Sequence, residues 1–133
     1  MPDRVPDRVT EGPLDGGPCV DLVCPWVDGD DPGLHEDMRK YASDPGHLNP
    51  ERTRDLYELL RYSLRSVAMY AGWVRNVYII TRRPQVPAWL DQDNPRVKVV
   101  HHDKLDGFGP YLPTFNSTAI ESFVHAVPEV SDH

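Results

Sequence analysis

The sequence predicts an α/β fold in which helices flank a parallel sheet. Two observations predict it: short runs rich in valine and isoleucine alternate with helical segments, and the first two runs are separated by enough residues for a helical crossover. A length of 133 residues with 39% hydrophobic residues suffices for one domain with a modest core. We expect a three-layer arrangement over residues 19–133, preceded by a disordered leader, residues 1–18, rich in proline and glycine.

Charge and hydropathy exclude several classes of protein. The net charge of −7 argues against non-specific nucleic-acid binding, which needs a basic face. There is no apolar run long enough for a transmembrane helix, and the first residues lack the apolar centre of a signal peptide. We expect a cytoplasmic location, and a position at the inner face of the membrane is compatible with it. Cys19 and Cys24 are about 16 Å apart along one predicted strand, so we expect free thiols and no zinc site.

The first predicted strand, Cys19–Val27, ends in the acidic loop Asp28–Gly33. Ligands of open α/β sheets bind where strands end at their carboxyl side. A calcium loop does not fit, because Pro32 and Arg39 would occupy ligand positions. Two interpretations remain: Asp30 or Asp31 caps a helix over residues 33–41, or the loop contacts a ribose hydroxyl or a divalent metal.

The longest helical pattern covers residues 54–71. Its apolar residues recur at helical spacing, between start signals at Pro50 and Glu51 and a stop at Gly72; they are Leu56, Leu60, Leu64, Val67 and Ala71. Arg61 and Arg65 are one turn apart, with Cβ atoms about 6 Å from each other. They are either two solvated arginines or a pair that holds a dianion.

Two further strands are predicted over residues 73–81 and 97–101. Arg82 and Arg83 follow the second strand, at the same edge of the sheet as the acidic loop, and are either solvated or a second anion contact. His101 and His102 point to opposite faces, which favours structural roles. A last amphipathic helix is marked by Ile120, Phe123, Val124 and Val127, and Thr118 with Glu121 has the spacing of a capping box. The amides at its N-terminus are available to an anion.

Several segments, in order, resemble conserved regions one and two of the Stealth family. They are DLVCPWVDGDDP, ELLRYSLRSVAMYAGWVRNVYIIT, VPAWL, NPRVKVV and LPTFNSTAIES. The sequence departs from the family pattern at Cys24 and Pro25, where Tyr-Thr is common, at Asp30, where Ser or Thr is common, and by one extra leucine before Arg61.

The resemblance implies a Rossmann-like catalytic domain that transfers a sugar 1-phosphate from a nucleotide diphosphate sugar to a hydroxyl of an acceptor glycan, in capsule or other cell-surface polysaccharide synthesis. It implies catalytic roles for Asp31 and Arg65. It also implies substrate contacts from Trp26, Asp28, Gly29, Arg61, Asn116, Ser117 and Glu121. A divalent metal, Mg²⁺ or Mn²⁺, is compatible with this chemistry but is not firmly implied, and no ligands are assigned.

The family's later acidic, basic and histidine motifs do not follow before His133. We therefore expect the N-terminal part of a catalytic domain, inactive on its own. Two other functions stay open: an inactive fragment with a structural or partner-binding role, and an ordinary nucleotide-sugar glycosyltransferase. A donor labelled in its β-phosphate distinguishes the last, because a glycosyltransferase leaves the label on the nucleotide.

Overall fold

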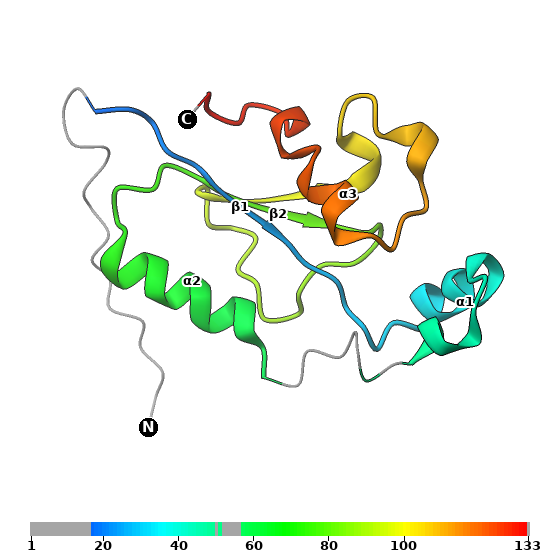
Figure 1. The fold of residues 1–133 in the computed structure, drawn as a ribbon. Coiled ribbons are helices and arrows are strands. Elements are labelled where there is room, and N and C mark those ends of the chain that lie inside the picture. The colour runs from blue at the N-terminus through cyan, green and yellow to red at the C-terminus, as the bar shows by residue number, and fades with distance from the viewer. Residues whose placement is uncertain (1–16, 50, 52–56, 133) are drawn as a thin grey trace.

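Figure 1 shows the computed structural model, which describes residues 17–49, 51 and 57–132. Three strands form one sheet: β1 (Leu22–Pro25), β2 (Val77–Thr81) and β3 (Val97–His101). Their order is β1-β2-β3 and both pairings are parallel. The predicted α/β class and the parallel pairing are confirmed. The expected disordered leader lies outside the described residues, apart from positions 17 and 18, and stays a prediction.

The first two strands are shorter than predicted, because turns take up their ends. The Val74 N–H donates to the Ala71 carbonyl at 3.0 Å, so the chain is still turning where the second strand was expected to begin. At the end of β1, Pro25 has no N–H to donate. The Trp26 N–H makes one more ladder bond, to the Ile80 carbonyl at 2.8 Å, before the loop begins. The third strand has its predicted bounds.

The helix α2 (Leu59–Tyr70) packs on one face of the sheet. Its predicted apolar stripe is confirmed, since its members pack against a core of Val74, Val77 and Ile79; these members are Leu60, Leu64, Val67 and Ala71. Leu56 and Pro50 lie outside the described residues. α2 begins at Leu59, because the preceding Glu58 adopts a left-handed conformation with φ of 49°; the part of the predicted helix over residues 54–56 lies outside the described residues.

The opposite face of the sheet carries α3 (Ser117–Glu121) and a second core of Tyr78, Ile80, Leu105, Phe108 and Val127. Figure 1 therefore shows the expected three layers: α2, the sheet and α3 with its neighbouring turns. The predicted apolar positions pack on this core, namely Ile120, Phe123 and Val124 beside the buried Val127.

Two predictions for this last helix were wrong. It ends at Glu121, because the Phe123 N–H bonds to the Ile120 carbonyl three residues back and the chain continues as a 3₁₀ turn, η5 (Val124–Ala126). The cap is Asn116 and not Thr118: the Asn116 side-chain oxygen accepts the Thr118 N–H at 3.0 Å. The Thr118 N–H, one of the amides expected to be available to an anion, is therefore taken by the Asn116 side chain.

The two histidines at the end of β3, His101 within the strand and His102 just after it, have structural surroundings, as predicted. Thr81 Oγ1 donates to the Gln85 carbonyl at 2.8 Å, so its contact with His101 Nδ1 at 2.8 Å requires a proton on that ring nitrogen. His102 opens the 3₁₀ turn η3 (His102–Lys104) and packs edge-on to Phe108 on the other face. The two cysteine thiols are free, also as predicted. Within the described ranges, no helix is long and apolar enough to cross a membrane.

Candidate functional site

The carboxyl ends of β1 and β2 bring the acidic loop and the second strand's exit loop together. The strands are parallel and in register, with Pro25 opposite Ile80, so the chain leaves both at the same edge. Figure 1 shows α1 (Pro32–Tyr41) beyond the arrowheads of these strands. The predicted proximity of Asp28–Gly33 to Arg82 is confirmed by an ion pair between Arg82 Nη1 and Asp31 Oδ2 at 3.3 Å.

Gln85 joins the two loops through its side-chain amide. Its Oε1 accepts the Asp28 N–H at 2.9 Å, and its Nε2 donates to the Asp28 carbonyl at 3.2 Å and to Asp31 Oδ2 at 2.7 Å. Gln85 is 7% exposed. Sequence reasoning missed this residue, because an isolated glutamine in a proline-rich loop carries no motif or periodicity.

Asp31 is the N-cap of α1, one of the two interpretations left open for the loop. Its Oδ1 accepts the Gly33 N–H at 2.9 Å, and its Oδ2 accepts from Gln85 and Arg82. The Gln85 hydrogen bond, assisted by Gly33 and by the Arg82 charge, holds the pKa of Asp31 below its ordinary value against the opposing effect of burial. Asp31 therefore stays ionised, with both carboxylate oxygens engaged.

Arg82 neutralises the base of the loop. Besides Asp31 it contacts the Asp37 carboxylate on α1, and it donates to the Gly33 carbonyl at 3.4 Å. The neighbouring Arg83 pairs instead with Asp103, at 3.1 Å, across the exit of β3. The two arginines after β2 thus act as counter-charges for this edge of the sheet.

Asp28 and Gly29 form the tip of the loop. The exposed Asp28 carboxylate accepts the Asp30 N–H at 2.9 Å through Oδ1. The buried Gly29 presents its carbonyl to His35 on α1, whose Nε2–H donates to it at 2.6 Å. The loop backbone is therefore fixed from two sides while the Asp28 side chain faces solvent.

Trp26 lies between the loop and the face of the sheet that α2 covers. Its ring packs against the core that also takes up Leu60 and Leu64. Among the described residues, its indole N–H is buried with no hydrogen-bond partner. Buried donors are almost always paired, so this N–H is an exception among the described residues.

The remaining predicted site residues stand on opposite sides of the sheet. Arg61 on α2 pairs with Glu58 at 3.1 Å, and the Arg65 guanidinium lies over the Tyr62 ring at 5.6 Å. On the other face, exposed residues of α3 and its cap include Asn116, Ser117 and Glu121. The structure thus places the arginines and the α3 residues around the sheet rather than in one cluster.

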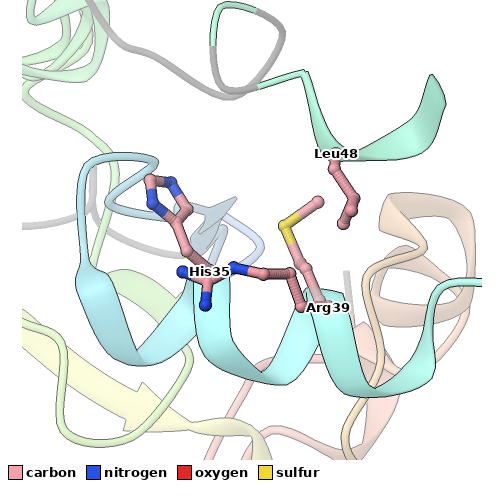
Figure 2. Close-up of a pocket in the computed structure, with 4 residues that line it drawn as sticks. His35, Arg39 and Leu48 are labelled. Carbon is pink, nitrogen blue, oxygen red and sulfur yellow. The ribbon is translucent and has the colours of Figure 1, made fainter. Parts of the chain in front are cut away.

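A small cavity lies on α1, behind the loop, and is lined by His35, Met38, Arg39 and Leu48. Figure 2 shows Leu48, from the 3₁₀ turn η1 (Pro45–Leu48), facing α1 across it. Its volume of about 100 Å³ is below that of pockets that bind cofactor-sized ligands. We interpret it as a packing gap between α1 and η1.

The described residues do not form a metal centre. No group of three or more His, Cys, Asp or Glu side chains in these ranges is arranged to hold an ion. Both carboxylate oxygens of Asp31 are already engaged by nitrogen donors, which leaves few oxygen ligands in the loop. Because divalent cations need several oxygen ligands, this arrangement does not by itself fit Mg²⁺ or Mn²⁺.

A parallel sheet with polar loops at its carboxyl edge defines an α/β protein of the kind that binds ligands at its strand ends. The chain belongs to the Stealth family: residues 52–133 match Stealth protein CR2, conserved region 2. This confirms the family predicted from the sequence. The assignment of residues 21–32 to conserved region one stays a prediction.

Curated relatives match most of the chain. It is 44% identical over 117 residues to an exopolysaccharide phosphotransferase of Streptomyces coelicolor, covering 86% of the chain and 19% of that relative. It is 40% identical over 124 residues to an exopolysaccharide phosphotransferase of Lactiplantibacillus plantarum, covering 93% of the chain and 35% of that relative.

An animal protein gives a shorter match at higher identity. The chain is 50% identical over 74 residues to the human N-acetylglucosamine-1-phosphotransferase subunits alpha/beta, which covers 56% of the chain and 6% of that relative. The chain therefore spans about a third or less of the length of these relatives.

Proposed function

We propose that this chain is the N-terminal part of a catalytic domain that transfers a sugar 1-phosphate from a nucleotide diphosphate sugar to a glycan hydroxyl, in the synthesis of a surface polysaccharide. The observation that carries the proposal is the similarity to relatives named as polysaccharide phosphotransferases, over 86% and 93% of the chain. The site supports it, because its polar groups lie at the sheet edge where such domains bind ligands.

In this reaction the acceptor hydroxyl oxygen forms a bond to the β-phosphorus of the donor. The bond from that phosphorus to the bridging oxygen breaks, the nucleoside monophosphate leaves with the electron pair, and the hydroxyl proton passes to a base. Such transfer depends mainly on positioning and on stabilising charge. Arg61 and Arg65, on α2, are the arginines to which we assign the stabilisation of the diphosphate charge; Arg61 is paired with Glu58 and Arg65 lies over the Tyr62 ring in this structure.

We assign the direct acidic contact with the nucleotide sugar to the exposed Asp28 carboxylate, and to Gly29 a contact through its backbone at the same turn. Asp31, for which the family resemblance implied catalysis, accepts hydrogen bonds from Gly33, Arg82 and Gln85, and we assign it a supporting role for this turn of the loop. We also assign a substrate contact to Trp26, whose buried indole N–H has no hydrogen-bond partner in the described part of the chain. Asn116, Ser117 and Glu121 stand exposed on the α3 face, to which we assign the glycan acceptor.

We place the reaction on the cytoplasmic side of the membrane. The two free thiols support this location, since reducing compartments keep cysteines unpaired. Cell fractionation tests this location: cytoplasmic and extracellular fractions of producing cells are separated, and an antibody detects this segment in each. Recovery of the segment in the extracellular fraction would contradict a cytoplasmic location.

The proposed transfer is tested with a complete enzyme that carries this segment. It is incubated with a glycan acceptor and a nucleotide diphosphate sugar labelled with ³²P in the β-phosphate. The expected product is a glycan that carries the label. Sugar transfer with the label left on the nucleotide would identify a glycosyltransferase, and absence of any transfer with intact folding would favour a structural or partner-binding role.

A further inference from the structure

We propose that Gln85 is a positioning residue for donor binding: it fixes the backbone of Asp28 and so determines where the Asp28 carboxylate stands at the edge of the sheet. The inference rests on the proposed function, because it takes the tip of the acidic loop as the donor contact. It goes beyond the site residues that the family resemblance implies, which include residues of the acidic loop but not Gln85.

The geometry is a two-point contact between a side-chain amide and one residue's peptide groups. Gln85 accepts the Asp28 N–H at 2.9 Å and donates to the Asp28 carbonyl at 3.2 Å, so the backbone of Asp28 is held at both polar groups. The second N–H of the amide serves Asp31 Oδ2 at 2.7 Å. Both N–H groups of the glutamine amide are thus used on the acidic loop, 57 and 54 positions away in the sequence.

Gln85 is itself held on the sheet. Its backbone N–H donates to the Arg82 carbonyl at 2.7 Å, and its carbonyl accepts the Thr81 hydroxyl at 2.8 Å. That hydroxyl accepts in turn from His101 at the end of β3. The contact with Asp28 is therefore anchored on two neighbouring strands, which gives the precision that a substrate-contacting group needs.

The side-chain chemistry makes glutamine difficult to replace at this position. Methionine has a similar length but would leave the Asp28 N–H without its acceptor. Glutamate would accept that N–H but would set a negative charge against the Asp28 carbonyl and the Asp31 carboxylate. The Gln85 contacts reach Asp28 through its main chain, so any effect of these variants on Asp28 chemistry passes through the loop backbone.

The first arm of the test uses this chain and needs no substrate. Gln85→Met is compared by NMR with the wild type and with Gln92→Met, which makes the same change at an exposed position between β2 and β3. We expect Gln85→Met to shift the Asp28 amide resonance and to raise the pKa of Asp31 toward its ordinary value, and Gln92→Met to do neither. An unchanged Asp28 amide and Asp31 titration in Gln85→Met would overturn the proposal.

The second arm uses a complete enzyme with this segment and a nucleotide sugar donor. We expect Gln85→Met to raise KM for the donor about tenfold with a much smaller change in kcat per folded molecule, and to lower the melting temperature, because the Asp28 N–H loses its acceptor. Gln85→Glu should lose donor binding as well. The double variant Gln85→Glu with Asp31→Asn should recover part of it, because the introduced amide restores a hydrogen-bond donor opposite the introduced carboxylate. A KM that stays at the wild-type value in both single variants would overturn the proposal.

The two arms separate this inference from the proposed function. If the wild-type enzyme transfers no labelled phosphate, the proposed function fails, and the NMR arm still decides whether Gln85 positions the loop. If the wild type transfers the label but Gln85→Met leaves both the loop resonances and the donor KM unchanged, the positioning role fails alone.

Discussion

Arg75 donates two hydrogen bonds to the carboxylate of Asp21, from Nε at 2.9 Å and from Nη2 at 2.5 Å. The Asp21 side chain is 1% exposed, and it also accepts the backbone N–H groups of Asn76 at 3.1 Å and Ser131 at 2.8 Å. One carboxylate therefore joins the start of β1, the connection before β2 and the C-terminal segment.

Asp21→Ala should lower the free energy of unfolding by about 3 kcal/mol, because it leaves two backbone donors and a partly buried guanidinium without their acceptor. Urea unfolding measures the loss. Asp106→Ala, at an exposed position, is the matched control and should change stability by less than about 0.5 kcal/mol. Equal effects of the two variants would show that the Asp21 contacts do not stabilise the fold.

Asp21 should also make the free energy of unfolding depend on pH in the acidic range. The Arg75 hydrogen bonds lower the pKa of Asp21 to about 2, from an ordinary 3.8. The folded state thus holds the ionised form more strongly than the unfolded chain does. This stabilisation is complete above about pH 4 and is lost as the pH falls toward 2.

Between pH 5 and pH 2 we expect the stability advantage of the wild type over Asp21→Asn to shrink by about 2 kcal/mol. Urea unfolding at each pH gives the difference, and the shared titration of Asp31 cancels in it. A difference that does not change with pH would mean that the ion pair has no effect on the Asp21 pKa.

The sequence predicted the sheet well because each strand lies in a short run that contains valine or isoleucine and is bounded by turn signals. It predicted the apolar face of α2 from a different pattern, the recurrence of Leu60, Leu64 and Val67 at helical spacing. The ends of elements were less predictable. The start of α2 depends on a left-handed Glu58, and the end of α3 on a change to three-residue hydrogen bonds, and neither leaves a pattern in the sequence.

His102 should make the protein sensitive to mild acid. Burial is the main cause that lowers the pKa of His102, and the nearby His101 and Arg82 act in the same direction. The unfolded chain therefore binds a proton more readily, and stability falls as the pH drops below the ordinary histidine value. We expect His102→Gln to lose less stability than the wild type between pH 7 and pH 5, by chemical unfolding. An equal or larger loss in the variant would contradict this.

The candidate site was partly predictable. The acidic loop and Arg82 follow parallel strands, so their meeting at one edge follows from topology alone. Which carboxylate is engaged and which is exposed depends instead on side-chain hydrogen bonds between loops. Gln85 engages the Asp31 carboxylate in this way, and, away from the site, Arg75 engages the Asp21 carboxylate. A single glutamine or arginine has no periodicity in the sequence, so a partner 54 to 57 positions away could not be inferred from it.

Two neighbouring residues of α2 should separate folding from function. Leu64 packs in the core between α2 and the sheet, so Leu64→Ala should cost about 2 kcal/mol or more through the cavity that it leaves. Arg65 lies off this stripe, with its guanidinium over the Tyr62 ring, a contact worth about 0.5–1 kcal/mol at an exposed site. Arg65→Ala should therefore lower the melting temperature less than Leu64→Ala.

Their effects on activity should be reversed in a complete enzyme that carries this segment. Arg65→Ala should lower kcat/KM for the nucleotide sugar at least about tenfold per folded molecule, because a positive charge beside the diphosphate is lost, and Arg65→Lys should retain part of it. Leu64→Ala should change the amount of folded enzyme and leave its kcat/KM close to the wild-type value. Melting curves and labelled-phosphate transfer measure both quantities. Full activity per folded molecule in Arg65→Ala, together with a loss of folding as large as that of Leu64→Ala, would make Arg65 a structural residue.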